Sequence, residues 1–263
     1  MKHLNFKNST LAYSDEGEGL AVVLLHGFLE NSKMWHNLVP VLLPKYRVVC
    51  IDLLGHGETE CIGYVHTMED MADAVHHILH FLQLEKVVVM GHSMGGGATM
   101  IAGASNLNIK GIVGLAPAET TPSAITAVAS ITVPALVFSG SSDGVTPAAE
   151  HHTPIYSALN SSCKSFVSIV GGAHCYFANT NFNCDFGEST SSTGISITRL
   201  EQQTRTYSVL DPWLDFILKD NCSAYASYLA ALSSSPLTLV SQSTCVANPI
   251  PVINENAGVL TSS

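Results

Sequence analysis

Short runs of apolar and β-branched residues recur along the chain, separated by polar stretches and turn residues. The runs occupy residues 20–25, 46–51, 86–90, 109–116, 133–140 and 165–170. Runs of this length without polar alternation are typical of strands that are buried on both faces, as they are in parallel sheets. Residues 4–15 alternate and turn instead, which predicts a β-hairpin ahead of the buried strands.

Helices are predicted between these strands. Residues 68–82 follow Thr67, which suits a helix N-cap, and Asp70 stands where it completes a capping box. Residues 31–43 and 154–159 predict shorter helices. Strands that alternate with helices predict an α/β fold with a mostly parallel central sheet and helices on both faces.

The C-terminal part of the chain has a different pattern. Residues 181–198 are rich in Ser, Thr and Asn, and we expect a surface excursion there. Residues 199–219 predict an amphipathic helix with a break at Pro212. The strand at 165–170 is expected to be the last one.

The length of the chain and its polar C-terminal end indicate how many domains it forms. The chain has 263 residues, which suits one α/β domain. From Ser233 onward it is rich in Ser, Thr and Pro. We expect a single domain over residues 1–245 and a flexible tail over residues 246–263.

The sequence Gly-His-Ser-Met-Gly at residues 91–95 lies between a predicted strand and a run of small residues that suits a helix. A Gly-x-Ser-x-Gly sequence at a strand-to-helix turn is the arrangement of a nucleophile elbow, which holds a serine hydroxyl above the sheet edge. Glycines are needed because Cβ atoms at Gly91 and Gly95 would clash where strand and helix pass closely. Ser93 is therefore the candidate nucleophile; an ordinary Gly-rich turn is the alternative.

Two later strand ends carry the other candidate catalytic side chains. Asp143 lies in the turn after the strand at 133–140, and His174 lies in a Gly-rich loop after the strand at 165–170. Asp143 alone is equally typical of an Asx turn. The order nucleophile, acid, histidine along the chain favours a triad with Ser93. Weaker candidates that follow strands or lie in nearby loops are Asp52, Glu119, His151 and His152.

The strand at 20–25 ends in His26-Gly27-Phe28. A glycine there allows the backbone to approach a ligand closely, so the N–H of Phe28 is a candidate oxyanion donor, with the N–H of Met94 as the second. We expect His26 to brace this loop rather than to react.

The composition of the chain restricts the classes of molecule that it is expected to bind. Charged residues make up 12% of the chain and the formal net charge is −10, which disfavours nucleic acid. No apolar run is long enough for a membrane span, and the first residues lack the apolar segment of a signal peptide. His76 and His80 share a face of the predicted helix beside His77, but no further ligand accompanies them, so we expect no metal and no other cofactor. The expected partner is a small-molecule ester, bound by a monomer; the resemblance described below adds polyesters.

Residue types are unevenly spread. All methionines lie at or before Met100, whereas five of the seven cysteines lie at or after Cys163. The first part is typical of a cytosolic enzyme and the last part of a secreted one, so the location stays open between the two.

The motifs at residues 26–28, 52–57 and 91–96 resemble those of the α/β-hydrolase superfamily. Residues 1–95 resemble small cytosolic α/β-hydrolases. Residues 93–245 resemble cutinase-like polyester hydrolases, including poly(ethylene terephthalate) hydrolases, through the elbow, Asp143-Gly-Val-Thr-Pro and Gly-Gly-Ala-His174-Cys. We hypothesise a mosaic of two hydrolase lineages joined near the elbow.

The resemblance to polyester hydrolases implies a serine esterase without a lid. The family's catalytic positions fall on Ser93, Asp143 and His174, and its oxyanion donors fall on Phe28 and Met94. The linker at residues 117–132 is too short for a helical lid. The resemblance also implies a substrate groove that includes His92, Val145 and Tyr176. Ala118 stands where many members carry a tryptophan that clamps an aromatic ring, which favours aliphatic over terephthalate esters.

Seven cysteines leave at least one thiol unpaired. In an oxidised chain we expect two disulfides, Cys175 with Cys184 and Cys222 with Cys245. The cysteines expected to stay free are Cys50, Cys61 and Cys163.

The leading functional hypothesis is hydrolysis of a carboxylic ester through an acyl-enzyme. The same triad also suits acyl transfer, perhydrolysis or a lyase step. A non-catalytic small-molecule receptor is the alternative from another class.

Overall fold

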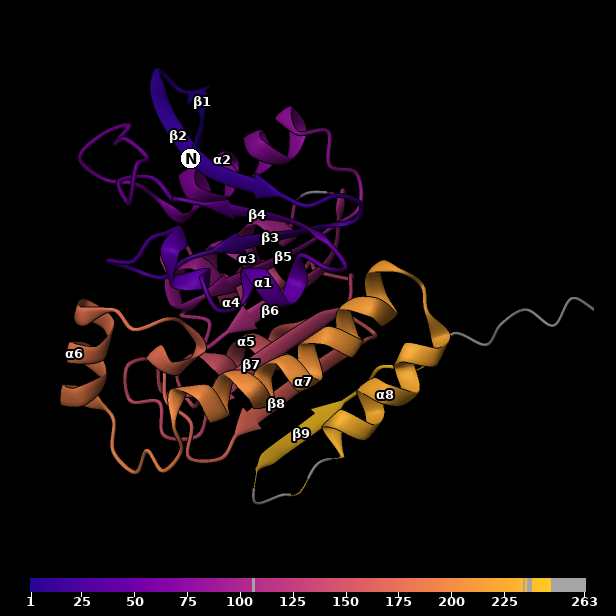
Figure 1. Cartoon of the computed structure of the whole chain (residues 1–263). Helices are drawn as coiled ribbons and strands as arrows, with labels where there is room; N and C mark the ends of the chain where they lie inside the picture. The colour runs from indigo at the N-terminus through magenta and orange to yellow at the C-terminus, as the bar shows by residue number, and fades with distance from the viewer. Residues whose placement is uncertain (106, 234, 236–237, 247–263) are drawn as a thin grey trace, which may run out of the picture.

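The computed structural model describes residues 1–105, 107–233, 235 and 238–246, and in this part of the chain the strands join into one sheet. The sheet has the order β1-β2-β4-β3-β5-β6-β7-β8-β9 (Figure 1). The strands are β1 Lys2–Phe6, β2 Ser9–Glu16, β3 Ala21–Leu25, β4 Arg47–Ile51, β5 Val87–His92, β6 Ile109–Leu115, β7 Ala135–Gly140, β8 Lys164–Ile169 and β9 Leu239–Ser243. Pairing is parallel from β4 to β8 in this order and antiparallel at both edges, which confirms the mostly parallel sheet.

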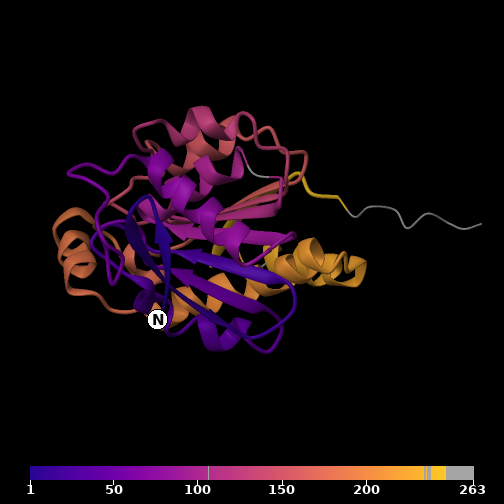
Figure 2. The ribbon, with the colours of Figure 1, turned by 90° about the horizontal axis from the view of Figure 1, so that it is seen from above.

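Alternate strand positions fill two apolar cores, one on each face of the sheet. In β5, Val87 and Val89 belong to one core, and Val88 and Met90 belong to the other. Figure 2 shows the helices on both sides of the sheet. The first core is covered by α2 Met68–Phe81, α3 Ser93–Gly103, α4 Ala124–Val128 and α5 His152–Ala158. The second is covered by η1 Ser32–Trp35, α1 Val39–Leu42, α7 Arg199–Leu218 and α8 Cys222–Leu232.

The N-terminus of α2 confirms the predicted cap. The Thr67 side chain accepts a hydrogen bond from the Asp70 backbone N–H, and the Asp70 side chain accepts one from the Thr67 backbone. These bonds satisfy two N–H groups that the first turn leaves without helical partners.

Strand β9 corrects the expectation that the strand at 165–170 is the last. β9 pairs antiparallel with β8, with Ser165 opposite Ser243. Only Leu239 among its residues is buried, because an edge strand needs little apolar surface. The sequence therefore lacks the apolar run that identifies the inner strands.

Helix α7 corrects the expected break at Pro212. The helix is continuous from Arg199 to Leu218 with Pro212 inside it. A proline in a helix interior costs about 3 kcal/mol. Buried side chains on both sides of it, including Leu210 and Trp213, pack against the sheet and keep the helix together.

The expected surface excursion at residues 181–198 contains a helix, α6 Phe182–Ser191. Asn181 caps it, because its side-chain oxygen accepts hydrogen bonds from the N–H groups of Asn183 and Cys184. This helix lies beside the carboxyl ends of the strands (Figure 1). Its Asp185 forms an ion pair with Arg199, the first residue of α7.

The disulfides confirm one expected pair and correct the other. Cys175 bonds to Cys184, which ties the loop after β8 to α6. Cys245 bonds to Cys163, a cysteine expected to stay free, rather than to Cys222. The reason is β9, because its register with β8 places Cys245 beside Cys163 at a Cα–Cα distance of 4.0 Å. Cys222 forms no disulfide, and neither do Cys50 and Cys61.

The segment between β6 and β7 holds only the short helix α4, and no lid domain is inserted there. None of the helices in the described residues has both the length and the apolar character needed to cross a membrane. Of the expected tail, residues 247–263 lie outside the described part of the chain.

Candidate active site

Ser93 occupies a strained turn between β5 and α3. Its backbone φ angle is +53°, a left-handed conformation that residues other than glycine rarely adopt. A Cβ atom on Gly91 would lie 2.1 Å from the Gly95 carbonyl oxygen, and one on Gly95 would lie 2.2 Å from the His26 carbonyl oxygen. The flanking glycines are therefore required by close backbone contact.

Asp143 and His174 come together from two neighbouring strand ends. Asp143 follows β7 and His174 follows β8, and both side chains are almost fully buried. Asp143 Oδ2 lies 2.8 Å from His174 Nδ1. Thr146 Oγ1 also lies 2.8 Å from the same nitrogen. Both contacts involve Nδ1, so the other ring nitrogen of His174, Nε2, is left available to exchange a proton.

The Asp143 carboxylate is held in its ionised form by its surroundings. Burial by itself raises the pKa of Asp143, but the hydrogen bond and charge of His174 and the Thr146 backbone N–H lower it below its usual value. Oδ1 accepts hydrogen bonds from the N–H groups of Val145 and Thr146 at 2.9 and 2.8 Å. An ionised carboxylate in this position orients an imidazole and stabilises its protonated form.

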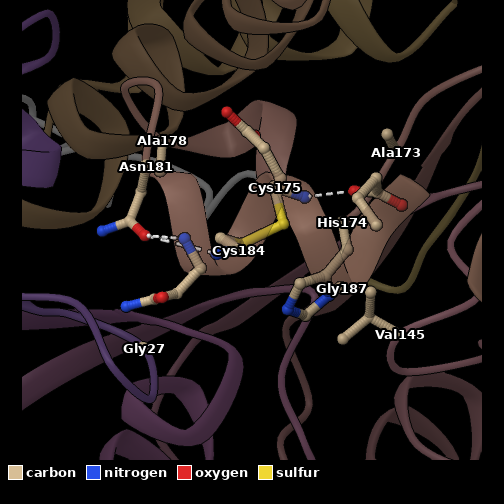
Figure 3. The surroundings of a disulfide bond; sticks show 12 residues. Gly27, Val145, Ala173, His174, Cys175, Ala178, Asn181, Cys184 and Gly187 are labelled. Carbon is tan, nitrogen blue, oxygen red and sulfur yellow. Dashed lines mark hydrogen bonds between the residues drawn. A yellow bond between two sulfur atoms is a disulfide. The ribbon is translucent and has the colours of Figure 1, made fainter. Parts of the chain in front are cut away.

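Ser93 and His174 border the same small cavity. Its other walls come from the loop after β3, from Val145 and from α6. The described contacts include no hydrogen bond between the Ser93 hydroxyl and His174, and such bonds are often long in unliganded sites. Figure 3 shows the His174 ring with Val145 and Gly187 beside it.

The loop after β3 carries the first expected oxyanion donor. Within the described residues, the Phe28 N–H has no hydrogen-bond partner, and its side chain is 57% exposed. Met94 is the second residue of α3, where N–H groups lack helical acceptors. Both N–H groups therefore have the free hydrogen that an oxyanion site needs, on segments that flank Ser93.

A buried glutamate beside this loop was not predicted. Glu30 Oε2 accepts the Gly27 N–H at 3.0 Å and lies 3.2 Å from His92 Nδ1. His92 Nε2 lies 3.0 Å from the His174 carbonyl oxygen. His92 borders the cavity, but protein groups occupy both of its ring nitrogens. The sequence signal for Glu30 is a carboxylate three residues after Gly27, in a chain with few charges.

The remaining expected substrate contacts lie in different surroundings. Val145 is 37% exposed and lines the cavity. Tyr176 packs under the Arg199 guanidinium, 4.7 Å from the ring centroid. Ala118 is buried, and its N–H bonds to the Ser93 carbonyl oxygen at 2.9 Å. Of these residues, only Val145 borders the cavity with an exposed side chain.

The weaker candidates have local partners instead. Asp52 accepts hydrogen bonds from the N–H groups of Ser32 and Glu58, and Glu119 accepts one from Ile125. His151 accepts the Glu119 N–H.

His152 is the exception, because it is buried next to the acid. Its Nε2 lies 3.7 Å from Asp143 Oδ2 and 3.0 Å from Thr146 Oγ1, and its Nδ1 lies 2.8 Å from Ser139 Oγ. Burial lowers the pKa of His152 to about 3, which keeps it neutral. His152 contacts the acid but is not among the residues that line the cavity bordered by Ser93 and His174.

Other histidines also have structural partners. His26 Nε2 accepts the Leu53 N–H at 2.8 Å, and burial lowers the pKa of His26 to about 4. His76 and His77 contact the backbone carbonyl oxygens of Ala102 and Asn5. Among the described residues, no cluster of three or more His, Cys, Asp or Glu side chains suits a metal ion.

Comparison with known proteins agrees with this architecture. The family model for the α/β hydrolase fold matches residues 21–131. A solved thermophilic esterase from Thermogutta terrifontis superimposes with a TM-score of 0.62 at 20% identity, over 80% of this chain and 94% of that one. The chain has the α/β-hydrolase fold.

Curated relatives match over a shorter length. An uncharacterised protein of Mycobacterium tuberculosis is 34% identical over 89 residues, which is 34% of this chain and 26% of that protein. The (E)-2-((N-methylformamido)methylene)succinate hydrolase of Acinetobacter baylyi is 32% identical over 88 residues, which is 34% of each chain. The chain thus spans about a quarter to a third of the length of these relatives.

Proposed function

We propose that this protein is a serine hydrolase that cleaves carboxylic esters through an acyl-enzyme. The observation that carries the proposal is the buried Asp143–His174 contact at 2.8 Å, which opens on the same cavity as Ser93 on its strained turn. The names of similar proteins, an esterase and a hydrolase among them, support the reaction class.

In the proposed reaction Ser93 attacks the ester carbonyl while His174 accepts the hydroxyl proton. Asp143 stabilises the imidazolium that forms. The N–H groups of Phe28 and Met94 donate hydrogen bonds to the oxyanion of the tetrahedral intermediate. His174 then returns the proton to the leaving alcohol, and water repeats the sequence on the acyl-enzyme.

The finer proposal is a cutinase-like preference for exposed esters, including polyester chains. No lid domain lies between β6 and β7, and the exposed side chains of Phe28 and Val145 border the cavity. Ala118 contributes no ring that would stack on an aromatic acid. We therefore expect aliphatic polyesters to be cleaved faster than poly(ethylene terephthalate).

The test compares soluble p-nitrophenyl esters with films of an aliphatic polyester and of amorphous poly(ethylene terephthalate), at equal enzyme loading. We expect turnover of short esters and more acid released from the aliphatic film. Ser93→Ala should lose on the order of 10⁴- to 10⁶-fold in kcat, because only binding and the oxyanion donors remain. Undiminished turnover by Ser93→Ala would refute the serine mechanism.

Two results would redirect the finer proposal. Faster release from the aromatic film would reverse the substrate ranking. Turnover of soluble esters without release from either film would indicate a small-molecule esterase. Added alcohol or peroxide, with analysis of the products, separates hydrolysis from acyl transfer and perhydrolysis.

We also retain the proposal of a mosaic origin. Its support is the concentration of methionines before residue 101 and of cysteines after residue 162. Separate homology searches with residues 1–90 and 98–245 test it, and retrieval of the same full-length relatives by both would overturn it.

A further inference from the structure

Two buried side chains join the loops that flank Ser93. The side chains of Glu30 and His92 are 1% and 0% exposed, and they lie 3.2 Å apart. Glu30 accepts a hydrogen bond from the Gly27 N–H, one residue before the Phe28 N–H. The Nε2 atom of His92 lies within hydrogen-bond distance of the carbonyl oxygen of His174. One pair of side chains therefore contacts both the oxyanion loop and the loop of the catalytic histidine.

The contacts of His92 require an additional proton. Its Nδ1 faces a carboxylate oxygen, and its Nε2 faces a carbonyl oxygen, so both partners are acceptors. Beside an ionised Glu30, a neutral imidazole carries one N–H and forms only one of these bonds. Both bonds form together when the ring is an imidazolium beside an ionised Glu30.

The electrostatic surroundings support this protonation state. Burial by itself lowers the pKa of His92, but the charge and hydrogen bond of Glu30 and the His174 carbonyl raise it above its usual value. Burial by itself raises the pKa of Glu30, but His92 and the Gly27 N–H lower it. Other titratable groups also interact with the pair through their charges: His174 and Asp143 act on it, His26 interacts with Glu30, and His152 interacts with His92. The ring of Phe177 packs against His92.

We propose that Glu30 and His92, as a buried carboxylate–imidazolium pair, are positioning residues that hold the Phe28 N–H and His174 in their places around Ser93. The proposal rests on the proposed esterase function. Oxyanion donors act mainly in the transition state, so displacing them lowers kcat more than it changes KM.

The pair also predicts the alkaline side of the pH profile. Because the pKa of His92 is raised above its usual value, the imidazolium is retained to higher pH than in a free histidine and is lost when the pH rises further. The neutral ring then loses one of its two bonds, and the loops shift. Activity should therefore fall on the alkaline side of the profile, when His92 loses its proton.

Glu30→Gln tests the pair, with Glu119→Gln as the matched control, because Glu119 binds a backbone N–H away from the cavity. We expect Glu30→Gln to lose on the order of 10- to 100-fold in kcat, with little change in KM, and to lose the alkaline limb. Glu30→Asp keeps the carboxylate and should recover part of the activity together with that limb. An unchanged kcat in Glu30→Gln, or loss of the limb in a folded Glu30→Asp, would overturn the proposal.

A second readout needs no turnover. In protein labelled with ¹⁵N-histidine, the His92 ring is assigned by its absence in His92→Gln. Both of its nitrogens should have protonated shifts at pH 7, and one should become unprotonated in Glu30→Gln. A neutral His92 in the native protein contradicts the pair, whereas absence of ester turnover with a protonated His92 contradicts only the esterase proposal.

Discussion

At the residue scale, the site depends on hydrogen bonds that orient one ring nitrogen of His174. Asp143 receives the N–H groups of Val145 and Thr146 as well as the His174 contact, so its position is fixed from several sides. Asparagine in its place keeps the shape but removes the charge and can present an N–H to the ring.

We therefore expect Asp143→Asn to lose on the order of 10²- to 10⁴-fold in kcat, because the imidazolium is no longer stabilised and the wrong tautomer is favoured. Asp52→Asn is the matched comparison, because its carboxylate binds only backbone N–H groups elsewhere. Steady-state kinetics on a soluble ester measures both. A greater loss in Asp52→Asn would assign the acid role to that residue.

Residues at strand ends could be predicted, and residues that meet through folded loops could not. Ser93, Asp143 and His174 each follow an apolar run, and strand order alone brings such positions to one edge. Glu30 meets His92 only because the loop after β3 turns back, with a left-handed φ of +56° at Leu29. No periodicity in the sequence encodes that turn.

At the element scale, α6 and β9 are the parts that the sequence pattern describes least well. Both lie at the surface, with one buried residue each. A disulfide joins α6 to the loop after β8, whereas β9 is held by its pairing with β8 and by the disulfide that follows it. Glu188 on α6 also accepts the Cys175 N–H at 2.6 Å, so this helix and the His174 loop are joined twice (Figure 3).

The two disulfides should therefore have separable effects. Closure of the 82-residue separation between Cys163 and Cys245 corresponds to about 4.5 kcal/mol of unfolded-state entropy, and the 9-residue separation to about 2.6 kcal/mol. We expect Cys245→Ser to lower the free energy of unfolding more and Cys184→Ser to lower kcat/KM more. Urea unfolding and ester kinetics measure the two quantities, and a larger kinetic effect in Cys245→Ser would contradict this assignment.

At the scale of the whole molecule, buried histidines govern the response to acid. Burial lowers the pKa of His26 to about 4 and of His152 to about 3, so the unfolded chain binds protons at these sites more readily than the folded one. Their contribution to stability is complete above their unfolded pKa of about 6.5 and is lost as the pH falls toward the folded values. His92, whose pKa is raised, acts in the opposite direction.

We expect the free energy of unfolding to fall between pH 6.5 and pH 4, by up to about 3 kcal/mol from His26 alone at 1.36 kcal/mol for each pKa unit. Urea titrations at several pH values measure it. His152→Gln should reduce the slope, and an unchanged free energy across this range would show that the buried histidines do not control acid stability.

The bond between Cys163 and Cys245 also determines how the protein can be attached to a solid support. Cys163 precedes β8 and His174 follows it, so the bond lies at the opposite end of a six-residue strand, roughly 20 Å from the site at 3.3 Å for each residue. Val246, next to the bond, is 71% exposed. An immobilisation handle placed at Val246 would leave Ser93 facing away from the bead, with access to solid as well as dissolved material.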